Sequence, residues 1–140
     1  MLLEEILGLV DTDIGASDSD IDIAGYWRNE LGSTIHIKKK IKETNSFGGT
    51  YSSTVGTDHH SHDGIITGHL HGDLIVFVVR WDSAAVSAWV GQVQKNKNNE
   101  RHKITTLWMM ASKSNGWTPI NVGADTFFYI PPQPQPDNLK

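Results

Sequence analysis

Residues 65–81 read IITGHLHGDLIVFVVRW, and this stretch decides the fold. It contains two runs rich in Ile, Val and aromatic residues, 65–71 and 74–81, on either side of Gly72-Asp73. Such runs around a Gly-containing pair are typical of two β-strands joined by a tight turn. The second run is apolar on both faces. We therefore expect one face to line an interior and the other to be covered by a partner subunit.

The same alternation of apolar stretches and turn residues continues along the chain. The strands predicted in this way are roughly 24–29, 33–41, 48–56, 65–71, 74–81, 85–94, 101–111 and 119–130. The breaks between them are 31–32, 45–47, 57–64, 72–73, 82–84, 95–100 and 112–117. Eight short strands with tight connections and no long helix favour an antiparallel sandwich or an up-and-down barrel. An eight-stranded barrel is just wide enough to hold one small ligand.

The two ends of the chain differ in composition from its middle. Residues 1–22 carry seven acidic and no basic residues, so we predict a flexible acidic tail with room for one short helical turn. Residues 131–140 are rich in Pro and cannot extend a sheet. The predicted barrel domain is therefore 23–130.

Charge and composition exclude several function classes. The formal net charge is −4, and residues 23–140 have nine acidic and twelve basic residues, too small a positive excess for a nucleic-acid-binding face. The absence of Cys excludes disulfides and Cys-based zinc sites. The longest apolar run, 74–79, is far shorter than the ~20 residues that cross a membrane. The first ten residues lack the positive charge that begins a signal peptide.

Seven short motifs occur in the order of the predicted strands. They are GYWRNELGST (25–34), GTYSSTVG (49–56), TG (67–68), Trp81, WVGQ (89–92), TLWMM (106–110), and Trp117 followed by VGADTF (122–127). Together they resemble the avidin/streptavidin family of biotin-binding proteins over about residues 23–130. This resemblance implies an all-β fold, an eight-stranded antiparallel up-and-down β-barrel. It also implies high-affinity, non-catalytic binding of biotin as a ligand, with no cofactor.

The resemblance further implies which residues form the pocket. Biotin has a ureido head, an apolar bicyclic body with a thioether, and a carboxylate tail, so its pocket must be polar at the bottom, aromatic in the middle and wet at the mouth. The implied biotin-binding residues are Asn29, Leu31, Ser33, Tyr51, Ser53, Val55, Thr57, Trp81, Ser83, Ala85, Ser87, Trp89, Trp108, Met110, Trp117 and Asp125.

The polar residues divide by their hydrogen-bonding roles. Asn29, Ser33 and Tyr51 would donate to the ureido oxygen, as an oxyanion hole does. Asp125 and Ser53 would accept from the two ureido N–H groups, and a bond to an ionised Asp is charge-assisted.

The apolar wall is implied to be mainly tryptophan. Trp81, Trp89 and Trp108 would surround the bicyclic body, while Trp27 plugs the closed end of the barrel. Ser87 would contact the thioether sulfur.

The mouth departs most from the family pattern. Thr57 stands where a backbone N–H meets the carboxylate, but the second contact, usually a hydroxyl, aligns with Ala85. Ser83 is the alternative. The lid over 57–64 is rich in His, and we hypothesise that protonation near pH 6 changes its order and releases the ligand. Loop histidines are more often solvated, so no metal site is predicted, although His69 and His71 share one strand face.

Assembly and location also follow from the resemblance. Trp117 is implied to enter the pocket of a neighbouring subunit, which requires a homodimer or, as is common in the family, a homotetramer. The family is secreted or periplasmic, and no nucleic-acid or membrane partner is expected. The alternatives are a lipocalin-like carrier of another small apolar ligand and an enzyme using the lid His and Asp residues. The absence of a paired-carboxylate signature disfavours the enzyme.

Overall fold

The computed structural model describes residues 2–10, 21–53, 61–95, 101–113 and 119–133. The elements are α1 (Leu3–Leu7), β1 (Gly25–Asn29), β2 (Thr34–Ile37), β3 (Ser46–Ser53), β4 (His62–His71), β5 (Leu74–Trp81), β6 (Ala85–Lys95), β7 (Arg101–Ser112) and β8 (Ile120–Ile130). No helix within the described ranges is long and apolar enough to cross a membrane.

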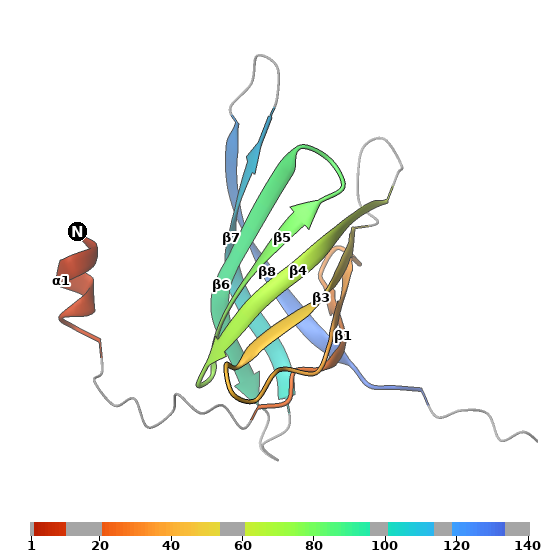
Figure 1. Cartoon of the computed structure of the whole chain (residues 1–140), viewed down its shortest axis with the longest axis horizontal. Coiled ribbons are helices and arrows are strands. Elements are labelled where there is room, and N and C mark those ends of the chain that lie inside the picture. Colours follow the sequence, from red (N-terminus) through yellow and green to blue (C-terminus); the bar gives the residue numbers. More distant parts are fainter. Residues whose placement is uncertain (1, 11–20, 54–60, 96–100, 114–118, 134–140) are drawn as a thin grey trace, which may run out of the picture.

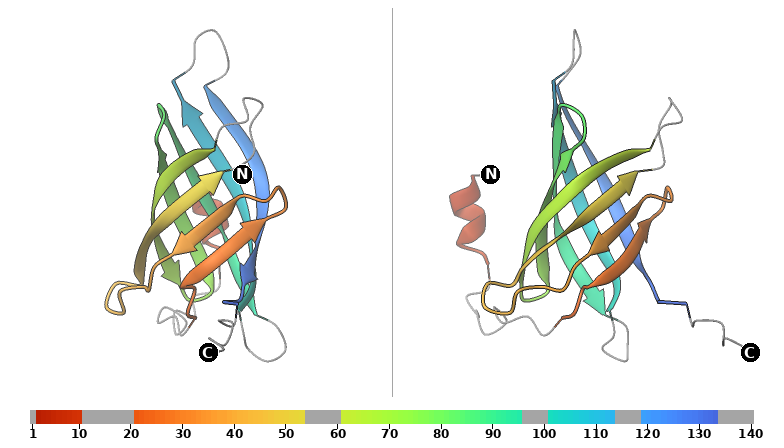
Figure 2. Two further views of the ribbon diagram at one scale, coloured as in Figure 1. Left: turned by 90° about the vertical axis from the view of Figure 1, so that its right-hand side faces the viewer. Right: turned by 45° about the vertical axis from the view of Figure 1, so that its right-hand side comes forward.

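The eight strands form one closed antiparallel barrel. Each strand pairs with the next along the chain, and β8 closes the barrel by pairing with β1, with Trp27 opposite Tyr129. Figure 1 and Figure 2 show the strands inclined around a common interior. The predicted up-and-down β-barrel is therefore confirmed, rather than a sandwich.

Within the described residues, three strand boundaries differ by two residues or more from those predicted. β2 ends at Ile37 and not at 41, because the lysine-rich segment turns back through Asn45, whose φ is 54°. Ser46 and Phe47, predicted to lie in a break, belong to β3, because Phe47 is buried and begins its inward-facing set. β4 begins at His62, so the end of the predicted 57–64 loop is strand.

Strand β5 shows how the barrel separates its two faces. Ile75, Phe77 and Val79 are buried in the interior, while Val76 and Val78, which alternate with them, are exposed. The alternation explains why this run is apolar throughout: one face fills the core and the other forms part of an apolar outer surface.

One end of the barrel is closed by apolar side chains, and we call Ile21, Ile23, Trp27 and Tyr129 the plug end. Trp27 is fully buried, and its Nε1 donates to the Ile23 carbonyl (3.0 Å). The Trp27 ring meets that of Tyr129 edge to face at 5.3 Å. Ile21 is also buried, so the packed region begins before the predicted boundary at residue 23.

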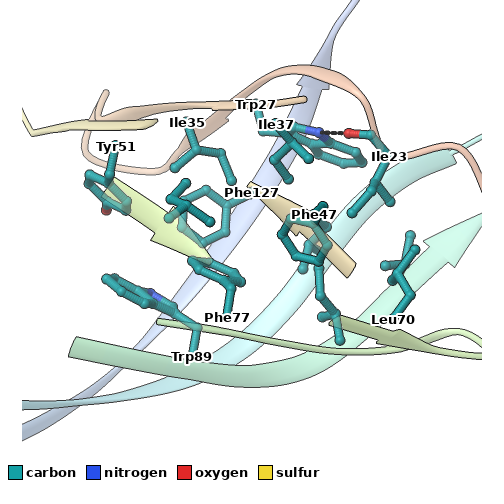
Figure 3. Packing of buried hydrophobic residues seen from close by; sticks show 14 of the residues in the cluster. Ile23, Trp27, Ile35, Ile37, Phe47, Tyr51, Leu70, Phe77, Trp89 and Phe127 are labelled. Carbon is teal, nitrogen blue, oxygen red and sulfur yellow. Dashed lines mark hydrogen bonds between the residues drawn. The ribbon is translucent and has the colours of Figure 1, made fainter. Parts of the chain in front are cut away.

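A polar and aromatic region lies at the other end of the barrel interior from the plug end. Figure 3 shows Tyr51 and Trp89 at one end of the buried cluster and Trp27 with Ile23 at the other. We call Asn29, Ser33, Tyr51, Trp89 and Asp125 the pocket end. All five are buried, and all five carry polar groups that apolar packing alone does not require.

Candidate ligand-binding site

Asn29, the last residue of β1, organises the turn that follows. Its Oδ1 accepts from the backbone N–H groups of Leu31 (3.1 Å) and Ser33 (2.9 Å). Gly32 allows this tight turn because its φ is 92°, a conformation that costs other residues energy. Two donors thus fix the amide oxygen, and the amide Nδ2 points inward and donates to the Tyr51 hydroxyl (3.4 Å).

Hydroxyl groups from three positions gather beside this amide. The Ser33 Oγ donates to the Ser53 Oγ at 3.5 Å, and Tyr51 lies against Ser33. Burial, followed by the nearby charge of Asp125, raises the pKa of Tyr51 well above its usual range, although the hydrogen bond with Ser33 lowers it. Tyr51 therefore keeps its proton at neutral pH and remains available as a donor.

Asp125 brings a buried carboxylate from β8, the strand that pairs with β1. It is only 9% exposed, and its Oδ2 accepts from the Trp89 Nε1 at 3.0 Å. The Thr106 hydroxyl donates to the Asp125 backbone carbonyl (2.9 Å) and holds this part of β8 against β7. A carboxylate has two acceptor oxygens, so one indole bond leaves acceptor capacity for a further donor.

The pKa of the Asp125 carboxyl group is shifted by its surroundings. Burial raises the pKa of Asp125, the hydrogen bond from Trp89 lowers it, and the negative charge of Glu30 raises it further. An anion that is buried in this way is stabilised most by a ligand that donates hydrogen bonds to it.

Stacked aromatic rings form the wall beside these groups. Trp89 stacks on Phe77 (centroids 4.9 Å apart, planes 9° apart) and on Tyr51 (5.3 Å, 27°). Figure 3 shows the rings of Phe77 and Trp89 lying parallel. Trp81 meets Tyr51 edge to face at 5.0 Å. Asp125, which accepts from Trp89, is therefore connected directly to the stack of aromatic rings.

Two further tryptophan contacts define the wall. The Trp81 Nε1 donates to the buried Ser87 Oγ at 2.8 Å, so Ser87 orients the indole in addition to offering its own O–H. Trp108 lies across from Gly123, where an added Cβ would come within 2.4 Å of its ring. Glycine at position 123 is thus required for the half-buried Trp108 to lie flat against β8.

The mouth has room beside Trp81. A groove of about 570 Å³ is lined by Arg80, Trp81, Ser83, Ala84, Ala85, Val86, Ala111, Ser112 and Lys113. It includes both Ser83 and Ala85, the two residues considered for the second carboxylate contact. Because the Ala85 N–H bonds to the Ser83 carbonyl (2.8 Å), the two residues form one tight turn.

Some predicted site residues are not part of this cluster. The Leu31 side chain is 67% exposed on the turn after β1 and does not line the interior. Met110, two residues after Trp108 on β7, is half-buried. Val55, Thr57 and Trp117 lie outside the described residues.

The histidine predictions fall partly outside the described residues. His59 and His60 are not described, while His69 and His71 are exposed on β4. Within the described ranges no group of three or more His, Cys, Asp or Glu side chains is placed to hold a metal ion.

Three residues of the site were not predicted from the sequence. Phe77 could have been found from its inward position two residues before Val79, and Thr106 opens the quoted TLWMM motif. Glu30 gives no local signal: its Oε1 accepts from the Thr126 N–H at 2.8 Å, across 96 residues of sequence.

Comparison with known proteins agrees with the fold of this barrel. The family model described as the Avidin family matches residues 17–130. Xenavidin shares 30% identity at a TM-score of 0.65, covering 77% of this chain and 96% of its own. A rhizavidin–biotin complex shares 29% at 0.69, covering 83% and 99%. Apo shwanavidin, at 23% identity and 0.64 over 81% and 99%, shows similarity of fold alone.

Proposed function

The chain belongs to the avidin family, and from this premise we propose that it binds biotin with high affinity inside the barrel and catalyses no reaction. The observation that carries the proposal is the buried pairing of an amide and hydroxyl cluster with a carboxylate. A urea has one strong acceptor oxygen and two N–H donors, and the pocket end offers the complementary set.

The donors support binding of the ureido oxygen. The Asn29 amide is oriented with its nitrogen inward because two backbone N–H groups occupy its oxygen. Tyr51 and Ser33 add hydroxyl donors that stay protonated at neutral pH. Three donors on one carbonyl favour the form with negative charge on oxygen, and we propose that they bind the urea in that form.

The acceptors support binding of the ureido N–H groups. Asp125 would accept one of them through the capacity that the Trp89 bond leaves, and Ser53 would accept the other. Because the carboxylate is buried, a ligand without a matching donor would leave it poorly satisfied and should be rejected.

The aromatic wall supports binding of the bicyclic body. Trp81, Trp89 and Trp108 would enclose it, with the Ser87 hydroxyl near the thioether sulfur. A carrier of a purely apolar ligand, such as a lipocalin-like protein, would gain nothing from a buried carboxylate at this position, since burying a charge is costly. This disfavours the lipocalin-like alternative.

We propose that the carboxylate tail is held at the mouth by the Thr57 backbone N–H and the Ser83 hydroxyl, with Val55 and Ala85 in van der Waals contact. The common groove of Ser83 and Ala85 supports this assignment. The lid from 57 to the start of β4 would cover the tail and loosen on protonation of its histidines. Equal dissociation rates at pH 5 and pH 8 would exclude such a role for the lid.

The outer face supports the proposal that the protein is a homodimer or homotetramer. Two apolar rows cross β5 to β8: Val76, Val90, Leu107 and Ala124, and Val78, Ala88, Met109 and Val122. Leu107 is 70% exposed in a single chain. A patch of this kind favours burial against a second copy, and Trp117 would then enter the neighbouring pocket.

Leu107→Glu should reduce the molecular mass of the assembly in solution, whereas Thr105→Glu on the same strand should not.

The test of the proposed function is isothermal titration with biotin and with desthiobiotin, which keeps the urea but lacks the sulfur. We expect exothermic binding of both near one ligand per chain, and tighter binding of biotin. The absence of heat with either ligand would overturn the proposal. Turnover of a biotin ester that disappears in a His59→Ala/His60→Ala variant would overturn its non-catalytic part.

For the biological role, we propose sequestration of biotin by a secreted or periplasmic protein. The purified protein should arrest a biotin-requiring culture, and added biotin should restore growth. Unimpaired growth at stoichiometric excess of protein would contradict this role.

A further inference from the structure

Glu30 links the first and last strands at the pocket end. The ladder between β1 and β8 stops where Asn29 lies opposite Phe127. One residue further along, the Glu30 side chain replaces the backbone as the partner of β8, because its Oε1 accepts a hydrogen bond from the Thr126 N–H at 2.8 Å. The side chain is exposed, yet its carboxylate is fixed at the residue next to Asp125.

Glu30 also acts on the buried groups through its charge. Its negative charge raises the pKa of Asp125 and that of Tyr51. Among the described residues, Glu30 from the turn is the charged group that acts on Asp125, and Tyr51 from β3 is the titratable group on which the charge of Asp125 acts. Strands β6 and β7 contribute Trp89 and Thr106, and neither of these is charged.

We propose that Glu30 is a positioning residue of the ureido site: its carboxylate holds β8 in place beside Asp125, and its charge sets the pH below which the pocket loses its urea ligand. This inference rests on the proposed function. It assigns pH control of the pocket to a residue that is not expected to touch the ligand.

The direction of the effect follows from the charge of Asp125. The ionised carboxylate accepts a ureido N–H in a charge-assisted bond, and the protonated acid accepts it less strongly. Any group that favours protonation of Asp125 therefore moves the loss of affinity to higher pH. Removing the charge of Glu30 should extend tight binding to lower pH.

The matched pair of variants is Glu30→Gln and Glu43→Gln. Glu30→Gln keeps an oxygen that can accept from Thr126 but removes the charge, and Glu43→Gln removes the same charge from the exposed segment between β2 and β3. We expect Glu30→Gln to bind desthiobiotin as the wild type does near pH 8, and about 2–5-fold more tightly near pH 5, as one nearby charge can achieve. Glu43→Gln should follow the wild type throughout. Identical pH profiles for the wild type and Glu30→Gln would overturn the inference.

A measurement without ligand separates this inference from the proposed function. The Asp125 carboxyl carbon can be titrated by NMR in the ligand-free protein, with a lower midpoint expected in Glu30→Gln. An unchanged midpoint would overturn the inference even if biotin binds. A lowered midpoint in a protein that binds neither ligand would support the charge coupling and overturn the proposed function.

The holding role is tested with Glu30→Ala, which removes the acceptor as well as the charge. We expect its pH midpoint to match that of Glu30→Gln. Its dissociation of desthiobiotin should be faster than that of Glu30→Gln at every pH, because the Thr126 N–H loses its partner. Equal rates in the two variants would exclude the holding role.

Discussion

The plug end and the pocket end each contain a buried tryptophan whose indole N–H is satisfied, and they differ in the acceptor. At the plug end Trp27 donates to a backbone carbonyl, that of Ile23. At the pocket end Trp89 donates to the side-chain carboxylate of Asp125. A backbone carbonyl is present wherever the chain runs, whereas a buried carboxylate must be stabilised against its desolvation. The plug end is thus built for packing and the pocket end for a ligand.

This difference predicts that the two ends divide stability and affinity between them. Side chains at the plug end remove apolar surface from water and should dominate the free energy of unfolding. Polar groups at the pocket end add little to stability until a ligand fills their remaining capacity. Substitutions at matched positions in the two ends test this division.

The largest expected effect comes from Trp27→Ala. The side chain is fully buried, so its removal should lower the free energy of unfolding by about 3–5 kcal/mol, measured by urea denaturation of ligand-free protein. Trp81→Ala is the matched control, because the Trp81 side chain is half-buried and lies at the mouth. This variant should lower the free energy of unfolding clearly less than Trp27→Ala does, and it should weaken biotin binding more. If Trp81→Ala were the more destabilising variant, the division would be wrong.

Next in size is the effect of Asp125→Ala on affinity. Loss of a hydrogen bond to a charged group is expected to weaken biotin binding by about 1.5–3 kcal/mol, or roughly 10–150-fold. Asp73→Ala, which removes an exposed carboxylate that accepts from Gln92 (2.9 Å), should leave affinity unchanged. Titration calorimetry of both variants measures the difference. Equal losses would show that a general change of charge is responsible.

The sequence allowed the strands and the identities of the pocket residues to be predicted, but not the contacts between those residues. The strands could be predicted because runs of β-branched and aromatic residues between turn residues are local signals, and β5 was predicted with the bounds that the structure gives, Leu74–Trp81. β2 was predicted too long because no local signal marks where a lysine-rich strand leaves its partner. The pocket residues were identified from motifs that occur in the order of the strands. Those motifs do not indicate which pocket residues form hydrogen bonds with one another. The Trp89–Asp125 contact joins β6 to β8 across β7, and Glu30 reaches β8 from the turn after β1. The first contact depends on the curvature of the sheet and the second on closure of the barrel between β1 and β8.

A smaller effect concerns pH and stability in the ligand-free protein. The pKa of Asp125 is raised in the folded state, so the folded protein binds this proton more tightly than the unfolded chain does, and stability falls as pH rises through that interval. Asp125→Asn removes the titration, and its amide oxygen can still accept from Trp89. We expect Asp125→Asn to gain stability over the wild type as pH rises above about 4. A constant difference between the two proteins would contradict a raised pKa.

The smallest expected effect lies at the plug end. Arg101 stacks over the Tyr129 ring (3.9 Å), donates to the Tyr129 hydroxyl and pairs with Asp22 at 3.3 Å. An exposed ion pair is worth about 0–1 kcal/mol and a cation–π contact about 0.5–1 kcal/mol, so Arg101→Met should lower stability by about 1 kcal/mol.

Asp22→Asn separates the two contributions, because it removes the ion pair and leaves the stacking in place. The loss of free energy of unfolding in Asp22→Asn, measured by urea denaturation, should be smaller than that in Arg101→Met. This loss should decrease as salt is added, since salt screens exposed charges. Neither variant should change biotin affinity. A change in affinity in Arg101→Met at unchanged stability would mean that the plug end is coupled to the pocket, and that the two ends of the barrel do not act independently.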